Sequence, residues 1–171
     1  ALTDKACAYI RQQAKTDRPF FLYYALSSPH TPVAPSKEWV GKSGLGKYAD
    51  FVMETDAMVG RVMEAIEHSG IADNTLVIFS SDNGCAPYIG VSALEAKGHF
   101  PSAQFRGYKS DAWDGGHRIP FIVRWPGTVK PGTTCGQTVC QMDLMATCAD
   151  ILGIQLPENA GRPINRQVRE V

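Results

Sequence analysis

The segment 77–90 carries a run of apolar residues that stops on Asp82, Asn83 and Gly84. An aspartate beside an asparagine offers one anionic and one neutral oxygen, which are the ligands that hard cations such as calcium and magnesium prefer. The glycine that follows is free to turn. Because Asp-Asn-Gly is also common turn chemistry, a plain turn is the alternative to a metal site.

Two other candidate residues lie elsewhere in the chain. His30, in Ser-Pro-His-Thr-Pro, could donate a proton or bind an anion, whereas a loop histidine bonded to backbone is the alternative. Lys109 lies in the segment 105–120, which mixes cations, glycines and carboxylates ahead of an apolar run. Cations among glycines can approach an oxyanion closely, although a solvated basic loop shows the same charge pattern.

Two short stretches look like a reactive-cysteine motif, C/S-x-P-x-R, and both lack its arginine. The stretch 85–89 begins with Cys85 and ends with Ile89, and the stretch 27–31 ends with Thr31. Cys85 is therefore expected to be a small, partly buried side chain and not a nucleophile.

The hydrophobic pattern predicts the elements that position these residues. Amphipathic helices are predicted over 3–16, 48–66 and 142–152. Continuous apolar runs predict buried strands over 20–26, 76–79 and 119–125. This order predicts an α/β fold with a largely parallel sheet flanked by helices. Ligands bind beyond the carboxyl ends of such strands, where His30 and the Asp82-Asn83 pair are placed.

The composition indicates one globular domain over residues 1–171, with a polar tail from about 157 that is loosely held. Seventeen basic residues balance seventeen acidic ones, which argues against nucleic acid or an anionic membrane as partner. No apolar run approaches the ~20 residues that span a bilayer. The five cysteines are scattered, and Cys135 and Cys140 are close enough to be bridged if the fold allows it.

Three blocks, taken in order, carry a family resemblance. PFFLYYALSSPHTP, ADNTLVIFSSDNG and FRGYKSDAWDGGHRIPFIVRWPG resemble the formylglycine-dependent sulfatases of the arylsulfatase type. The likeness runs from about residue 6 to residue 156, and the stretch 141–147 resembles the family's helix after the third strand. The resemblance implies that the sheet is part of an alkaline-phosphatase-like sulfatase domain.

The resemblance also implies roles for four residues. Asp82 and Asn83 would be two ligands of the active-site divalent cation, usually Ca2+. Lys109 would bind the sulfate and stabilise its charge, and His30 would donate a proton to the departing alcohol. The family's nucleophile is a formylglycine made from C/S-x-P-x-R, a motif that these 171 residues lack. Asp114-Gly115-Gly116 is expected to be scaffold.

The function that the resemblance implies is sulfuric ester hydrolysis, with this chain a fragment that is inactive alone. A sulfated small molecule or sulfated carbohydrate would be the substrate, a homo-oligomer is left open, and the location would be periplasmic, secreted or lysosomal. One alternative is a phosphodiesterase or phosphonate hydrolase of the same superfamily, which would more often show Asp and His ligands for a second metal. Another is a non-catalytic binding domain that kept the sheet.

Overall fold

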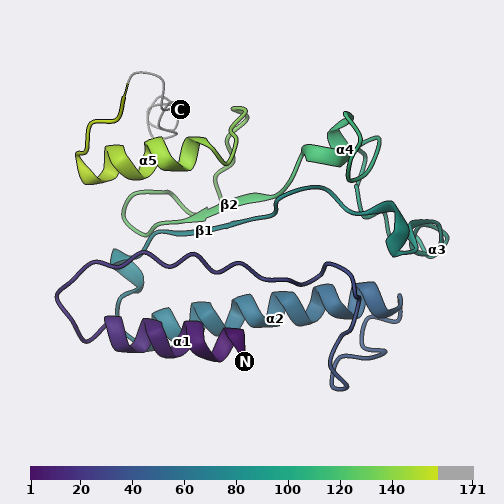
Figure 1. Cartoon of the computed structure of the whole chain (residues 1–171), viewed down its shortest axis with the longest axis horizontal. Coiled ribbons are helices and arrows are strands. Elements are labelled where there is room, and N and C mark those ends of the chain that lie inside the picture. The colour runs from purple at the N-terminus through teal and green to yellow at the C-terminus, as the bar shows by residue number, and fades with distance from the viewer. Residues whose placement is uncertain (158–171) are drawn as a thin grey trace. The chain divides into compact units, whose positions relative to one another are not determined.

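The computed structural model describes residues 1–157, so the tail that we predict to be loosely held lies outside the described residues. The contacts divide the chain into two compact units, residues 1–130 and 131–171. The single domain over 1–171 stays a prediction. Figure 1 gives the order of the elements along the chain.

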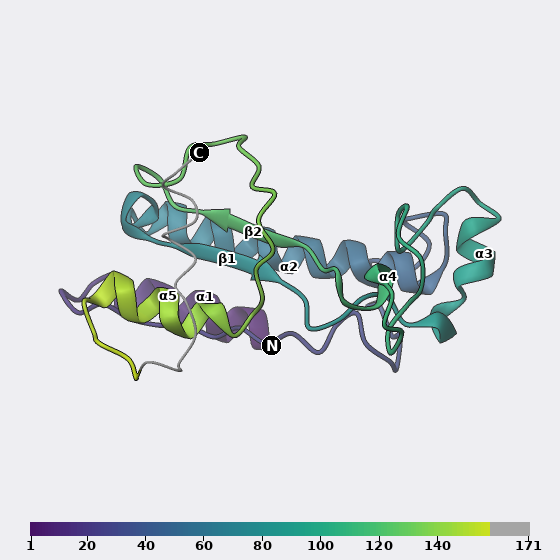
Figure 2. The same ribbon diagram turned by 90° about the horizontal axis from the view of Figure 1, so that it is seen from above.

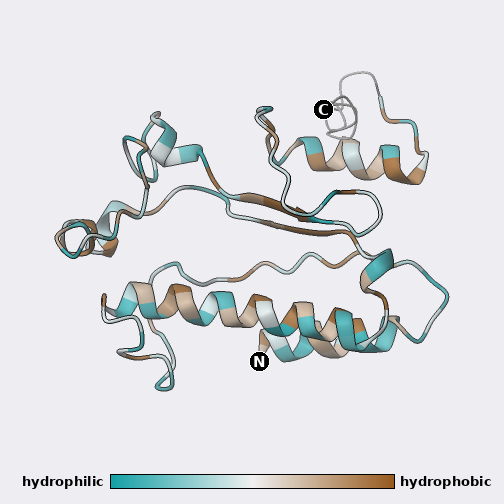
Figure 3. Ribbon diagram, turned by 180° about the vertical axis from the view of Figure 1, so that it is seen from behind, coloured by the Kyte–Doolittle hydropathy of each residue, from teal (hydrophilic) through white to brown (hydrophobic). Residues whose placement is uncertain are grey.

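Two helices that lie side by side form the core of the first unit (Figure 1). These are α1, Leu2–Gln13, and α2, Lys47–His68, and both confirm the predicted helices. They bury a cluster of small and branched side chains, namely Cys7, Ile10, Ala65, Ile66 and Ala72. On α2, residues of opposite hydropathy alternate along the helix, as expected when one face is buried (Figure 3).

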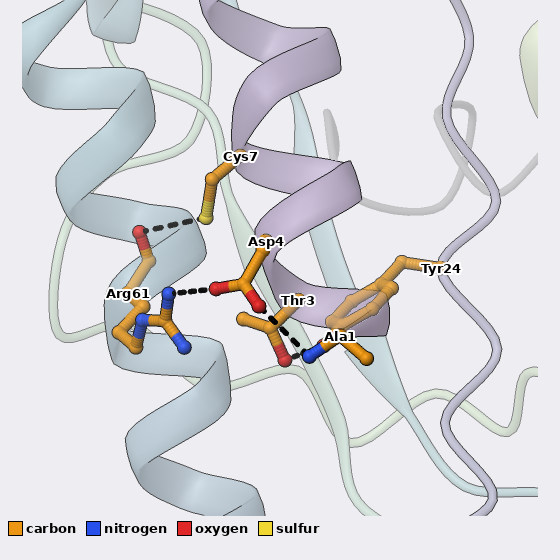
Figure 4. A network of polar contacts seen from close by, with 6 residues as sticks. All are labelled: Ala1, Thr3, Asp4, Cys7, Tyr24 and Arg61. Atoms are coloured by element: carbon orange, nitrogen blue, oxygen red, sulfur yellow. Dashed lines mark hydrogen bonds and ion pairs between the residues drawn. The ribbon is translucent and has the colours of Figure 1, made fainter.

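Polar contacts at the rim of this core join α1 to its neighbours (Figure 4). The carboxylate of Asp4 pairs with the ammonium of Ala1 at 2.8 Å and with the guanidinium of Arg61, on α2, at 2.5 Å. These two cations, the ammonium first, lower the pKa of Asp4 to about 2. The hydroxyls of Thr3 and Tyr24 lie 2.7 Å apart and tie α1 to the extended segment that follows it.

The two strands, β1, Val77–Ser80, and β2, Phe121–Arg124, confirm two of the three predicted strands. They pair antiparallel, with Val77 opposite Arg124 and Ser80 opposite Phe121. The prediction of a largely parallel sheet is therefore wrong for the described part of this chain. The reason is the connection: β2 begins at the end of the sheet where β1 stops, whereas a parallel pair needs a crossover that carries the chain back to the other end.

The apolar run 20–26 is extended but is not a strand in the structure. Phe20 and Leu22 pack against the helical core, while Phe21 and Tyr23 are 79% and 81% exposed. The prediction of a buried strand over 20–26 is therefore wrong. Its backbone makes no hydrogen bond to another described segment. Without a neighbouring strand to pair with, the run cannot form part of a β-sheet, whatever its composition favours.

The connection between the two strands holds three short helices. They are η2, Pro87–Ile89; α3, Val91–Glu95; and α4, Asp114–His117. In Figures 1 and 2 both α3 and α4 lie at the end of the unit that β1 points to. A further short helix, η1, Ala72–Asn74, joins α2 to β1.

The second unit contains α5, Asp143–Leu152, which confirms the last predicted helix. It ends at Gly153, whose φ of 67° is a left-handed conformation that glycine adopts readily. Cys135 and Cys140 are both exposed and are free thiols, so the bridge that their spacing allows is not formed. Among the described residues, no helix is long and apolar enough to cross a membrane.

Candidate functional site

The Asp82-Asn83 pair follows β1 after one residue, as predicted from the end of the apolar run. Asp82 is exposed, and its carboxylate has no hydrogen bond or ion pair with any described residue. The amide nitrogen of Asn83 donates to the carbonyl oxygen of Gly84 at 3.0 Å. That bond occupies the donor end of the side chain, so the pair presents a carboxylate and an amide oxygen to a ligand.

Backbone hydrogen bonds join this turn to the loop that carries Lys109. The N–H of Gly84 donates to the carbonyl of Gly116 at 2.9 Å. The N–H of Lys109 donates to the carbonyl of Cys85 at 2.7 Å. These bonds bring together two of the segments that sequence reasoning singled out, although Cys85 and Lys109 lie 24 positions apart in the sequence (109 − 85).

The side chains of Lys109 and His30 meet across 79 positions of sequence, with Lys109 Nζ at 3.5 Å from His30 Nε2. The other ring nitrogen, Nδ1, lies 2.8 Å from the carbonyl oxygen of Thr31. Because a carbonyl only accepts, the hydrogen-bond network assigns the proton to Nδ1, which leaves Nε2 as the acceptor for the lysine ammonium. His30 is thus held by its own loop with Nε2 directed at Lys109.

The segment around Lys109 is braced by stacked cations. The guanidinium of Arg106 lies 3.9 Å from the ring centre of Trp113, and that of Arg118 lies 4.5 Å from the ring centre of Phe105. Arg118 also donates to the carboxylate of Asp114 at 3.2 Å. The cations of this loop are therefore engaged within it, and the scaffold role of Asp114 stays a prediction.

Sequence reasoning missed a small polar cluster beneath this loop. The hydroxyl of Tyr108 donates to the carboxylate of Glu95, on α3, at 2.7 Å, and that bond raises the pKa of Tyr108. Burial raises the pKa of Tyr48 to about 12, and it also raises the pKa of the Cys85 thiol. A raised thiol pKa disfavours the thiolate, which agrees with the expectation that Cys85 is not a nucleophile. No residue pattern in the sequence marked Glu95 as a partner of Tyr108.

The side chains of Asp82 and Asn83 are of the type that binds calcium, but two residues are too few to complete its coordination. Calcium takes six to eight oxygen ligands, and Asp82 and Asn83 supply a carboxylate and an amide oxygen that have no other described partner. Across residues 1–157, no group of three or more His, Cys, Asp or Glu side chains is arranged to hold a metal ion. The two residues can therefore form one side of a metal site, with the other ligands coming from elsewhere.

Known proteins resemble this chain over nearly its whole length. An N-acetylgalactosamine-6-O-sulfatase of Bacteroides thetaiotaomicron is 38% identical over 162 residues, which cover 93% of this chain and 31% of that protein. An arylsulfatase of Hemicentrotus pulcherrimus is 39% identical, over 91% of this chain and 26% of its own length. The chain thus spans about a third or less of the length of these two relatives.

Solved structures share its fold. A Bacteroides thetaiotaomicron sulfatase, from work on the metabolism of multiple glycosaminoglycans, matches 98% of this chain and 36% of its own, with a TM-score of 0.86 at 35% identity. The protein Ps i-CgsB, in complex with a neocarrahexaose, covers 99% of this chain and 38% of its own, with a TM-score of 0.85 at 28% identity. The neighbours therefore place the described elements in the alkaline-phosphatase-like fold of sulfatases.

A family model described as Sulfatase matches residues 1–154. The match includes the turn with Asp82 and Asn83 and the paired side chains of Lys109 and His30. The chain belongs to the sulfatase family.

Proposed function

We propose that the protein hydrolyses sulfate monoesters and that this chain supplies the anion-binding and proton-donating side of its active site. The observation that carries the proposal is the 3.5 Å contact between Lys109 Nζ and His30 Nε2, beside a turn whose Asp82 carboxylate is unpaired. An ammonium and an imidazole suit an anionic ester, and the carboxylate suits a divalent cation that would neutralise the same ester.

Lys109 acts on the charge of the sulfate. A sulfate monoester is an anion, so attack on its sulfur requires that the charge on the sulfate oxygens be neutralised. An ammonium serves as a point charge for such oxygens. Asp82 and Asn83 would hold the calcium ion, which when bound supplies further neutralisation of the same oxygens.

His30 acts on the departing alcohol. In the structure its Nε2 accepts from Lys109, and its Nδ1 proton is held by the Thr31 carbonyl. When sulfate oxygens take over the hydrogen bonds of the lysine ammonium, Nε2 is released and can carry a proton. That proton is given to the bridging oxygen as the ester bond breaks, so the alcohol leaves neutral.

We propose carbohydrate sulfates as the substrate class. The relatives include N-acetylgalactosamine-6-sulfatases, and one structural neighbour was solved with a carrageenan oligosaccharide. A sugar alkoxide is a strongly basic leaving group, which is where a positioned general acid contributes most. Hydrolysis of this class therefore makes the fullest use of His30.

The test uses the natural gene product that carries this chain, assayed with a 6-sulfated N-acetylgalactosamine and with 4-nitrophenyl sulfate. We expect Lys109→Ala to lower kcat/KM by about 100- to 1,000-fold on both esters. We expect His30→Ala to lower it by about 100-fold or more on the sugar sulfate and much less on the aryl sulfate, whose leaving group needs no acid. Asp82→Ala is expected to abolish the calcium-dependent activity on both esters.

The matched control is Lys97→Ala, because the Lys97 ammonium donates to the carbonyl of Gly44 and makes no contact with Lys109, His30 or Asp82 that is seen in the described residues. Wild-type activity in Lys109→Ala, or equal losses on both esters in His30→Ala, would contradict these roles. Faster hydrolysis of phosphate diesters than of sulfate esters would favour the phosphodiesterase alternative.

A further inference from the structure

At three positions beside the site, glycine is required because a side chain would clash with neighbouring backbone, and not because the backbone conformation demands it. Gly84, Gly115 and Gly116 are absent from the glycines with positive φ, so their backbones suit an L-residue. An added Cβ at Gly84 would lie 1.9 Å from the carbonyl oxygen of Gly115, and one at Gly115 would lie 2.0 Å from that of Gly107. One at Gly116 would lie 2.3 Å from the carbonyl oxygen of Asp111. No side chain, even a methyl group, fits at these positions.

The three glycines form a continuous contact among three segments of backbone: the turn after β1, the loop 106–111 and α4. Gly84 belongs to the turn after β1, and Gly115 and Gly116 are the buried residues of α4. The contact is closed by the hydrogen bonds Gly84 N–H to Gly116 C=O, at 2.9 Å, and Gly115 N–H to Arg106 C=O, at 2.8 Å. Because the backbones are in direct contact, no side chain lies between the segments that could change its rotamer and alter their separation.

The groups that carry charge lie next to this contact on both sides. Asp82 and Asn83 immediately precede Gly84, and Lys109 follows Gly107 by two residues. Gly107 provides the carbonyl on which Gly115 packs, and the N–H of Lys109 is itself bonded to Cys85, the residue after Gly84. The contact thus sets where the backbone of Lys109 lies relative to the two oxygen ligands.

We propose that Gly84, Gly115 and Gly116 are positioning residues that hold Lys109 in register with Asp82 and Asn83. That the glycines matter for catalysis rests on the proposed function. That they fix the position of the Lys109 backbone rests on the close packing alone. A methyl group at any of the three positions would push the segments apart and move Lys109 away from the anion. The helical core around Ile10 lies on other elements and would keep its stability.

Amide hydrogen exchange on this chain tests the structural part without any activity. Gly115→Ala is expected to speed exchange at the Lys109 and Gly84 amides by about tenfold or more, the factor expected when a backbone hydrogen bond is lost. The amide of Ile10 should keep its rate. Gly60→Ala is the matched control, because an added Cβ at Gly60, on α2, meets nothing within 4 Å. Unchanged exchange at Lys109 and Gly84 would overturn the proposal, and so would equal acceleration at Ile10.

Activity of the natural gene product tests the catalytic part. We expect Gly115→Ala to lower kcat by about 100-fold, the loss that a displacement near 1 Å produces. If the glycine acts through Lys109, the same change in a Lys109→Ala background should cost little more, because the group to be positioned is already gone. An equal loss in both backgrounds would mean a general structural role and would overturn the proposal.

A second variant guards against misfolding, since Gly84→Ala probes the same contact from the turn after β1. An unchanged exchange rate at the Ile10 amide shows in each case that the helical core is still folded. If the gene product hydrolyses no sulfate ester, the proposed function fails, and the exchange data still decide whether the glycines hold the three segments together.

Discussion

Replacing Ile10 with alanine tests whether the α1–α2 contact is the stabilising core of the first unit. Ile10 is 1% exposed and packs in the cluster with Cys7, Ala65, Ile66 and Ala72. The change removes three carbon groups, which is about 2.4 kcal/mol of transfer free energy at ~0.8 kcal/mol each. The cavity left behind adds to this, so we expect a total loss of about 3–4 kcal/mol in the free energy of unfolding.

The assay is urea unfolding of this chain, followed by circular dichroism. Leu2→Ala is the matched control, because Leu2 lies on the same helix and is 51% exposed, and it should cost less than about 1 kcal/mol. A loss below about 1 kcal/mol for Ile10→Ala, or equal losses for the two variants, would refute the assignment of this cluster as the core. The first unit would then draw its stability from contacts outside the two helices.

Two further predictions concern charge and turnover. Asp50 is buried, and its carboxylate accepts from the hydroxyl and N–H of Ser43 and from the N–H of Gly41, which together lower its pKa. A lowered folded-state pKa means stability that is present above the unfolded value of about 3.9 and is lost as the pH falls through the folded value. Asp50→Asn should therefore lower the Tm at pH 7 by several degrees and flatten its decline in acid; an unchanged acid limb in thermal scans would contradict this. The chain of 171 residues should not hydrolyse 4-nitrophenyl sulfate, since it lacks C/S-x-P-x-R. Turnover that disappears on Lys109→Ala would show that another nucleophile serves.

Hydrophobic periodicity predicted the three longer helices and two strands because each is decided locally. On α2 the apolar residues recur at three- and four-residue steps, and on β1 an apolar run ends at the polar turn. The relative direction of two strands, in contrast, is not decided by local residues. Whether β2 runs with or against β1 depends on the end of the sheet at which a connection of some 40 residues returns, and no residue in either strand records that.

The run 20–26 also shows that local sequence does not determine strand pairing. Its composition predicts burial, and Phe20 and Leu22 are packed on the core as expected of one face. The second face, with Phe21 and Tyr23, is exposed because the described chain offers this segment no neighbouring strand. A pattern of side chains predicts which residues favour a sheet, whereas the hydrogen bonds of a sheet belong to a pair of segments.

The candidate site was predictable in its residue types and not in its contacts. Asp82, Asn83, Lys109 and His30 carry recognisable chemistry, and their blocks resemble those of sulfatases. The glycines were interpreted as turn and scaffold residues, because glycine in a sequence signals a permissive backbone. Its second use, close approach of two chain segments, becomes visible only when the neighbouring carbonyl is located.

Stability and site geometry therefore depend on different parts of the first unit, and this separation can be tested by crossing the two experiments. Ile10→Ala removes packing on α1 and α2 and should lower the global free energy of unfolding, with no selective opening at the Lys109 amide. Gly115→Ala displaces backbone at α4 and should open the Lys109 amide while the urea midpoint changes little. If each variant moved both readouts together, the core and the site would unfold as one cooperative unit. The glycine contact would then owe its rigidity to the helices and not to its own close packing.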